Sequence, residues 1–304
     1  MRNNLKEYTM GKLKEEMQRY MKIQGYAEHT IIAYTTHVQT MAQHYKKSPL
    51  KITKAEIGDF ILNLREKGRS ESTVQLYYRA FCFFYRMKGL EDRVPKLAYH
   101  RRRRRMPYIL SNKSVVQLLN SCSNIKYKTL FSLAYSSGLR ISEIRNLTIK
   151  DLNFERNQIY VKNSKYRKDR YTVLGNNAMI LLKEYIKIYK PHHYLFFHNA
   201  DISRRVCRDE VYREFKKILT INGLSIKNIH LHTLRHCFAT HLVENGTSIF
   251  HVMHLLGHSN IMTTMVYLHM RAPDKLKITS PIDLIEIKEA PNPKTQILLF
   301  PASA

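Results

Sequence analysis

Two histidines, an arginine and a tyrosine are spaced so that they could meet in one place between His230 and Tyr267. His232 and Arg235 are three residues apart in a stretch of helical pattern, so their side chains would share one face of a helix. His258 follows a glycine that would end a second helix, and Tyr267 comes nine residues later. An arginine beside histidine donors suits an anionic phosphate, and a phenol beside them could act as a nucleophile.

A chain reversal is predicted between these two helices. Asn245 and Gly246 supply the left-handed turn that ends the first helix. Thr247 or Ser248 would cap the second helix, and Gly257 would close it. The two imidazoles, the guanidinium and the phenol are therefore expected around a single turn of the chain.

In order and spacing, these residues resemble the tyrosine recombinases, the integrase and Xer-type group. The resemblance covers roughly residues 10 to 285 and rests on these motifs: Gly138-Leu139-Arg140-Ile141-Ser142-Glu143, His232-Thr233-Leu234-Arg235-His236, Leu256-Gly257-His258-Ser259 and Tyr267. It implies a mainly α fold with a small antiparallel β-sheet in the C-terminal domain. An N-terminal helical core-binding (SAM-like) domain would precede a tyrosine-recombinase catalytic domain.

Cleavage of a phosphodiester without metal needs a nucleophile, positive charge on the non-bridging oxygens and a proton for the departing 5′-oxygen. Tyr267 is the candidate nucleophile. Arg140 and Arg235 are the candidate phosphate clamp, because a guanidinium is planar, permanently charged and donates in a fork. His232 and His258 would complete the set, as donors to the phosphate or as proton carriers.

Two further residues of the motifs have supporting roles in this interpretation. Glu143 comes one turn after Arg140, where it could orient a clamp residue or simply cap its helix, and the resemblance favours the first. His236 directly follows Arg235 and is expected to support the helix structurally.

Lys165 is the candidate general acid, in the turn between two predicted strands. The register of Lys168, Asp169 and Arg170 matches the family's Lys-x-Arg element and puts Lys165 at the position of the family's catalytic lysine. The glycines usual on either side are missing, so Lys162 and Lys168 remain alternatives.

The charge of the chain points to a polyanionic partner. It has 51 Lys and Arg against 24 Asp and Glu, a net charge of +27, with 44% hydrophobic residues for a core. No apolar run approaches the ~20 residues of a membrane span, and the amphipathic N-terminus lacks the apolar region of a signal peptide. The cysteines are far apart and predict buried thiols in a reducing cytoplasm: Cys82, Cys122, Cys207 and Cys237.

Residues 1–95 are predicted to form a small helical DNA-binding domain. Apolar residues recur at helical spacing in three stretches, residues 10–45, 51–66 and 74–87. Thr53 is the expected N-cap of the third helix, and Leu76 is expected on the apolar face of the fourth. The fourth helix also carries residues that could meet DNA or equally form a solvated face: Thr73, Gln75, Arg79 and Arg86.

Residues 96–107 are predicted to be a basic linker. The linker contains a run of arginines that no folded core could bury: Arg101, Arg102, Arg103, Arg104 and Arg105. Such a run can be a solvated linker or a localisation signal. In a chain of this charge we favour a strap across the phosphate backbone of DNA.

Residues 108–280 are predicted to form the catalytic domain. Helices are expected at residues 111–119, 127–135, 140–147, 176–189 and 209–220, besides the two around the turn. The stretches 158–162 and 170–174 are β-branched and aromatic, which predicts two short strands. The tail, residues 281–304, is expected by the resemblance to dock on a neighbouring subunit; packing on its own domain is the alternative.

The resemblance implies a site-specific recombinase that cuts and rejoins DNA through a 3′-phosphotyrosyl intermediate, without metal, ATP or other cofactor. The role would be integration, transposition, cassette capture or dimer resolution. The partners would be double-stranded DNA with paired half-sites and three further copies of the chain, forming a tetramer. The protein would be cytoplasmic, prokaryotic and nucleoid-associated, with no membrane partner.

Three other functions fit parts of the sequence. A type IB topoisomerase would use related chemistry to relax DNA. A DNA-binding protein without catalysis is disfavoured by the complete set of site residues. Zinc could be bound by histidines four residues apart, His232 with His236 and His254 with His258, but no carboxylate pattern accompanies them, so no metal site is expected.

Overall fold

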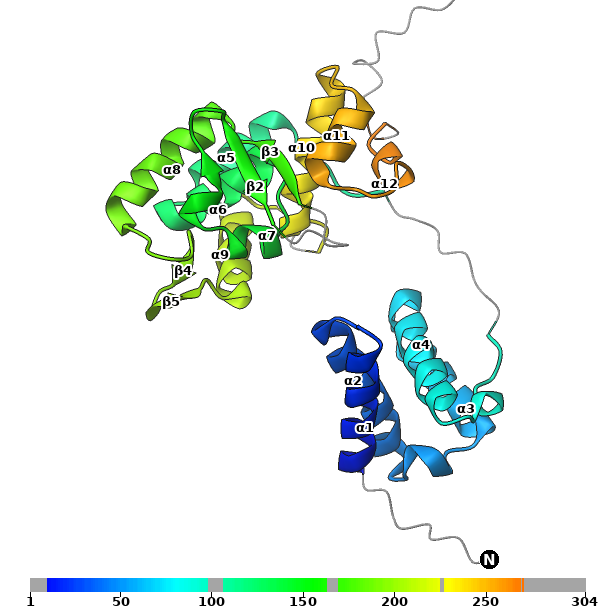
Figure 1. The fold of residues 1–304 in the computed structure, drawn as a ribbon. Helices are drawn as coiled ribbons and strands as arrows, with labels where there is room; N and C mark the ends of the chain where they lie inside the picture. The colour runs from blue at the N-terminus through cyan, green and yellow to red at the C-terminus, as the bar shows by residue number, and fades with distance from the viewer. Residues whose placement is uncertain (1–9, 98–105, 163–168, 225–226, 269, 271–304) are drawn as a thin grey trace, which may run out of the picture. The chain divides into compact units, whose positions relative to one another are not determined.

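The computed structural model describes residues 10–97, 106–162, 169–224, 227–268 and 270 (Figure 1). The chain divides into two compact units, residues 1–104 and residues 105–304. Among the described residues, no helix is both long and apolar enough to cross a membrane.

The first unit is a bundle of four α-helices, as the apolar spacing predicted. Its elements are α1 (Met10–Ile23), α2 (Glu28–Tyr45), the 3-10 turn Pro49–Lys51, α3 (Lys54–Glu66), α4 (Glu71–Met87) and the 3-10 turn Glu91–Arg93. The apolar faces of the four helices enclose one core, in which Leu13, Val38 and Phe81 are fully covered or nearly so. Burial of these faces, rather than helix propensity alone, stabilises helices of this length.

Local signals fix the starts of α3 and α4. Thr53 caps α3 and forms a capping box with Glu56, which is the predicted N-terminus. Ser70 caps α4 through the backbone N–H of Thr73. The prediction for Leu76 was wrong: its side chain is 38% exposed, because Val74 occupies the core-facing position of that turn.

The second unit is mostly helical with two small sheets. Its elements are α5 (Asn112–Asn120), α6 (Ile125–Ser136), α7 (Ile141–Asn146), the 3-10 turn Ile149–Asp151, β1 (Leu152–Asn153), β2 (Gln158–Val161), β3 (Arg170–Val173), α8 (Asn176–Tyr189), β4 (Phe197–His198), β5 (Asp201–Arg205), α9 (Arg208–Ile221), α10 (Leu231–Glu244), α11 (Ile249–Leu256) and α12 (Met262–Met265). The predicted fold class, mainly α with a small antiparallel sheet in the C-terminal unit, is confirmed.

The larger sheet has the order β1-β2-β3 and is antiparallel throughout. The predicted hairpin is present, with Tyr160 opposite Tyr171. Neither β1 nor the pairing of β4 with β5 was predicted from the sequence, although a short extended piece was expected at residues 194–197. Strands β1 and β4 have two residues each and are too short to show alternation. Strand β5 is polar and largely exposed, so it carries no apolar pattern of period two either.

Helix α10 lies between two apolar clusters and is buried on most sides. Leu234 and Cys237 belong to the main core of the unit, whereas Phe238 and Val243 pack with α11 and Tyr267. A helix covered in this way holds its polar side chains in fixed positions.

Two of the four cysteines depart from the predicted burial. Cys122 and Cys237 are buried, but Cys82 and Cys207 are only half-buried. Cys82 packs against the edge of the first core, and Cys207 stands at the N-cap of α9, where side chains reach solvent.

Candidate active site

Arg235 is the centre of the candidate site. Its side chain projects from α10 and the residue is 1% exposed. The guanidinium donates to the backbone oxygens of Gly138 and Leu256, each at 2.6 Å, and lies 3.2 Å from Nε2 of His258. These contacts join three separate segments, so the direction of the guanidinium is fixed before any ligand binds.

Glu143 is surrounded by three guanidinium groups. Its carboxylate accepts from Nη1 of Arg140 at 2.8 Å and from both Nη atoms of Arg170 at 3.0 and 2.9 Å. Nη1 of Arg235 lies 3.7 Å away. The same carboxylate accepts from the backbone N–H of Arg140 at 2.8 Å, so Glu143 both caps α7 and orients the clamp residues.

The electrostatic balance at Glu143 favours its ionised form. Burial raises the pKa of the carboxyl, but hydrogen bonds and charge from Arg170, the N–H of Arg140 and the charge of Arg235 outweigh burial and bring this pKa to about 2. Burial and Arg140 in turn lower the pKa of Arg235 to about 9, against the opposing effect of Glu143. Glu143 and Arg235 are therefore both charged at neutral pH.

Arg170 is a site residue that the sequence analysis used only to set a register. Besides holding Glu143, it donates from Nε to the backbone oxygen of Leu255 at 2.8 Å. A Cβ on Gly257 would lie 2.8 Å from Cδ of Arg170, so only glycine fits beside this side chain. Arg170 thus ties β3 to the end of α11. Two signals in the sequence point to Arg170: its charge at the start of a predicted strand and its place in the Lys-x-Arg element.

His258 is held by two hydrogen bonds. Its Nε2 faces Arg235, which can only donate, so Nε2 is the acceptor and Nδ1 carries the hydrogen that faces Thr264 Oγ1 at 2.9 Å. Burial, together with Arg235, Arg140 and Arg170, lowers the pKa of His258 to about 3. The imidazole is therefore neutral in the unliganded protein.

Tyr267 is 3% exposed and packs against Phe238 and Val252. Its hydroxyl lies 3.0 Å from Nδ1 of His236. Burial raises the pKa of the phenol above its ordinary value, and the charges of Arg235 and Arg140 offset only part of that rise. The phenol therefore lies within the electrostatic field of both clamp arginines.

His232 and His236 stand edge to face on α10, with ring centroids 5.4 Å apart. Burial, His232 and Arg235 lower the pKa of His236 to about 4. His232 retains an exposed edge, yet the protein around it and the charges of Arg235 and Arg140 lower its pKa too. Both rings are neutral at physiological pH.

The structure brings together seven of the predicted site residues: Arg140, Glu143, His232, Arg235, His236, His258 and Tyr267. Lys165 and its alternative Lys168 lie outside the described residues. The other alternative, Lys162, forms an ion pair with Asp151 at 2.6 Å. Among the described residues, no group of three or more His, Cys, Asp or Glu could hold a metal ion.

The DNA-binding candidates of the first unit fall on different faces of α4. Gln75, Arg79 and Arg86 follow one helical stripe, and both arginines are exposed. Thr73 lies off this stripe, with its hydroxyl 2.9 Å from that of Ser70. The arginine run, residues 101–105, is outside the described residues.

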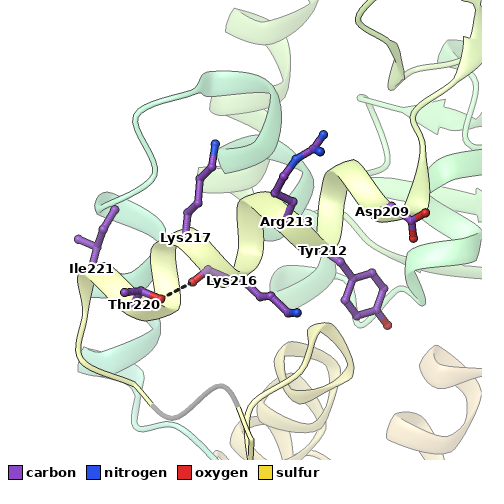
Figure 2. A pocket seen from close by; sticks show the side chains of 7 residues that line it. All are labelled: Asp209, Tyr212, Arg213, Lys216, Lys217, Thr220 and Ile221. Atoms are coloured by element: carbon purple, nitrogen blue, oxygen red, sulfur yellow. Dashed lines mark hydrogen bonds between the residues drawn. The ribbon is translucent and has the colours of Figure 1, made fainter.

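A second polar surface, missed by the sequence analysis, lies on α9. Its exposed face borders a shallow hollow of about 740 Å³, lined by Asp209, Tyr212, Arg213, Lys216, Lys217, Thr220 and Ile221 (Figure 2). Figure 2 shows Arg213 and Lys217 projecting from the same side of the helix. The opposite face of α9 is apolar and buried, through residues such as Phe215, so the basic face is the one left to solvent.

A helical bundle followed by a helical unit that gathers arginines, histidines and a tyrosine defines the class of tyrosine-type DNA-rearranging enzymes. The phage integrase family model matches residues 108–273, and the N-terminal SAM-like domain of phage integrases matches residues 13–95. The chain belongs to the phage integrase family, the tyrosine recombinases, as the motifs predicted.

Individual relatives agree with this assignment. The chain is 31% identical over 259 residues to tyrosine recombinase XerA of Pyrococcus horikoshii, covering 83% of this chain and 87% of that protein. It is 31% identical over 279 residues to tyrosine recombinase XerD of Oceanobacillus iheyensis, covering 84% and 93%. Its fold is similar to that of a lambda integrase dimer bound to a COC′ core site, with a TM-score of 0.68, 17% identity and coverage of 83% and 96%.

Proposed function

We propose that this protein is a site-specific recombinase in which Tyr267 attacks a DNA phosphate. The products are a 3′-phosphotyrosyl link and a 5′-hydroxyl, and the 5′-hydroxyl of a partner strand then attacks that link. The observation that carries the proposal is the position of the Tyr267 phenol, within the field of Arg140 and Arg235 and beside the neutral His236. Because the energy of the broken bond is kept in the ester, neither metal nor ATP is needed.

Arg140 and Arg235 would both bind the phosphate, but in different ways. The side chain of Arg140 is 21% exposed and that of Arg235 only 2%. Arg235 would meet a non-bridging oxygen in a direction already fixed by its backbone contacts, once the groups that cover it move aside, whereas Arg140 could itself adjust as DNA enters. Preorganised charge of this kind stabilises the phosphorane more than the ground state. His232 would donate to the same oxygens. His258 would do so only once its Nε2 gains a proton and turns from Arg235 to the phosphate, and Lys165 would protonate the leaving 5′-oxygen.

Several basic surfaces would hold the DNA. The exposed face of α9 offers Arg213, Lys216 and Lys217, and the stripe on α4 offers Arg79 and Arg86. The arginine run, residues 101–105, would add a strap across the backbone. Each phosphate neutralised steepens the log–log salt dependence of binding by ~0.9.

The larger assembly follows from the proposed exchange of strands. Four copies would hold two duplexes at paired half-sites, with residues 281–304 of each copy docking on its neighbour. Integration, transposition, cassette capture and dimer resolution would all use this chemistry. Relaxation of DNA by a type IB topoisomerase reaction is the second candidate, because it needs the same phosphotyrosyl step.

Covalent trapping on a nicked suicide duplex tests the nucleophile. Tyr267→Phe is expected to abolish the covalent adduct while leaving DNA affinity nearly unchanged. Tyr135→Phe is the matched control, because the Tyr135 hydroxyl lies 2.9 Å from Nδ1 of His241, another histidine of α10. This control should form the adduct. An adduct with Tyr267→Phe would show that the nucleophile is another residue.

Plasmid substrates distinguish the two candidate functions. A recombinase should exchange strands at a preferred site and require two copies of it. Relaxation of supercoiled plasmid at many positions, with no dependence on a second site, would favour the topoisomerase reaction.

A further inference from the structure

Helix α10 makes two histidine–tyrosine contacts of nearly the same length. His236 Nδ1 lies 3.0 Å from the hydroxyl of Tyr267, and His241 Nδ1 lies 2.9 Å from that of Tyr135. The two pairs differ in their surroundings. Both clamp arginines act on the phenol of Tyr267, whereas the neighbours that act on the Tyr135 phenol are Cys237 and Glu244, which raise its pKa along with burial.

The charge state of His236 sets the direction of its hydrogen bond. The titratable groups that act on or beside it are His232 and Arg235 on the same helix, His258 after α11 and Tyr267 after α12. Burial, His232 and Arg235 keep the ring neutral, with a pKa of about 4. A neutral imidazole has one nitrogen with a lone pair, so Nδ1 can accept the phenolic hydrogen while Nε2 carries its own.

We infer that His236 is the catalytic base that accepts the phenolic proton of Tyr267 during attack on the phosphate. The inference rests on the proposed function and assigns a role to a residue that the sequence analysis regarded only as structural support. In the step, the O–H bond of Tyr267 breaks and its proton moves to Nδ1. The phenolic oxygen forms a bond to phosphorus, and the bond from phosphorus to the 5′-oxygen breaks.

The low basicity of His236 in the unliganded protein does not oppose this role. A phosphodiester between Arg140 and Arg235 brings negative charge that offsets the guanidinium field on the ring. The imidazolium formed during attack then lies near the extra negative charge of the phosphorane. In the rejoining step the same proton returns to the departing phenolate, so the ring ends as it began.

The contact has a competing explanation, in which His236 only latches the buried Tyr267 in a resting position. The two explanations predict opposite effects. Loss of a latch would leave cleavage equal or faster, because the phenol would be released. Loss of a base would slow the chemical step on DNA that is already bound.

Single-turnover cleavage of a nicked duplex at saturating DNA separates them. The His236→Asn variant keeps a polar side chain but cannot take a proton at neutral pH, and we expect cleavage to slow by about 10²-fold or more. The rising limb of the rate between about pH 5 and about pH 8 should flatten. The control His241→Asn should stay within a few-fold of the unmodified protein. Equal rates for the two variants, or faster cleavage by His236→Asn, would overturn the inference.

A substrate with sulfur in place of the 5′-bridging oxygen adds a second readout. Sulfur leaves without protonation, so this substrate should rescue a variant that lacks the general acid but not His236→Asn. Rescue of His236→Asn would assign the residue to the leaving-group side and contradict the base role.

A measurement on the unmodified protein covers the case in which the variant fails to fold. Nitrogen NMR of the full chain reports which ring nitrogen carries hydrogen. The inference requires hydrogen on Nε2 of His236 and a lone pair on Nδ1; the opposite tautomer would overturn it. If the unmodified protein forms no covalent adduct with any DNA, the proposed function itself fails. If the unmodified protein forms the adduct and His236→Asn cleaves DNA at the same rate, only the assignment of His236 as the base fails.

Discussion

Each unit of the molecule contains a glutamate in the third position of a helix, and the two glutamates have different roles. In the first unit, Glu56 accepts from the N–H of Thr53 at 2.9 Å and pairs with the exposed Lys47. In the second, Glu143 makes the same backbone contact to Arg140, but its side chain is 7% exposed against 22% for Glu56.

The difference shows how one local motif becomes part of a site. The capping contact is set by neighbouring residues and forms in either unit. Only in the second unit do β3 and α10 bring Arg170 and Arg235 onto the same carboxylate. An exposed pair such as Lys47 and Glu56 is screened by water, whereas a covered carboxylate among guanidinium groups interacts strongly with each of them.

The largest effect is expected from Glu143→Gln. The substitution keeps the shape but leaves guanidinium groups of Arg140, Arg170 and Arg235 together without their anion. Removing one partner of a buried ion pair costs about 3–5 kcal/mol, so the melting temperature and DNA cleavage should both fall clearly. Glu56→Gln is the control in the first unit and should change both far less. Equal losses would show that capping, not the arginine cluster, accounts for Glu143.

The pH dependence of stability tests the same comparison, because the stabilisation by Glu143 should be lost as the pH falls. The pKa of Glu143 is about 2 when folded, against an ordinary value of 4.5, so its ion pairs stabilise the fold fully above the ordinary value. That contribution should disappear as the pH falls from 4.5 toward 2. The difference in melting temperature between unmodified protein and Glu143→Gln should shrink over this interval. A difference independent of pH would contradict the pKa shift as its cause.

A smaller effect is expected when alanine replaces a glycine that follows a helix, Gly68 in the first unit or Gly257 in the second. Gly68 and Gly257 have φ of +68° and +66°, so alanine at either position costs about 1–2 kcal/mol of backbone strain. A Cβ at Gly68 meets nothing within 4 Å, whereas one at Gly257 collides with Arg170. Gly257→Ala should therefore lose more stability than Gly68→Ala and also slow cleavage, as measured by melting and covalent trapping. Similar cleavage by both variants would mean that Arg170 can move without affecting the site.

The smallest effect is expected from His37→Phe. His37 is a largely covered histidine of the first unit, comparable to the histidines of the candidate site. Its ring stacks on Tyr77 at 3.9 Å, and among the described residues neither ring nitrogen has a hydrogen-bond partner. Burial lowers its pKa from 6.5, so protonation favours the unfolded state and stability should fall as the pH drops below that value. The protection factors of α2 amides, which compare the measured exchange with the intrinsic rate at each pH, should fall at acid pH in the unmodified protein but much less in His37→Phe. An unchanged pH response in the variant would assign the effect to another group.

The sequence by itself determined the helices, the main hairpin and most members of the site. Apolar spacing, N-caps such as Thr53 and Ser111 and turn glycines such as Gly257 act over a few residues, so they can be read along the chain. The order of motifs also identified the family and its candidate nucleophile.

Only the tertiary structure decided how those residues meet. Arg170 holds Glu143 from 27 positions away, and His236 meets Tyr267 from 31 positions away. Contacts of this kind depend on how helices and strands pack, which no local pattern specifies. Burial decided the pKa values at the site, because the same carboxylate or imidazole titrates differently once water is replaced by neighbouring guanidinium groups.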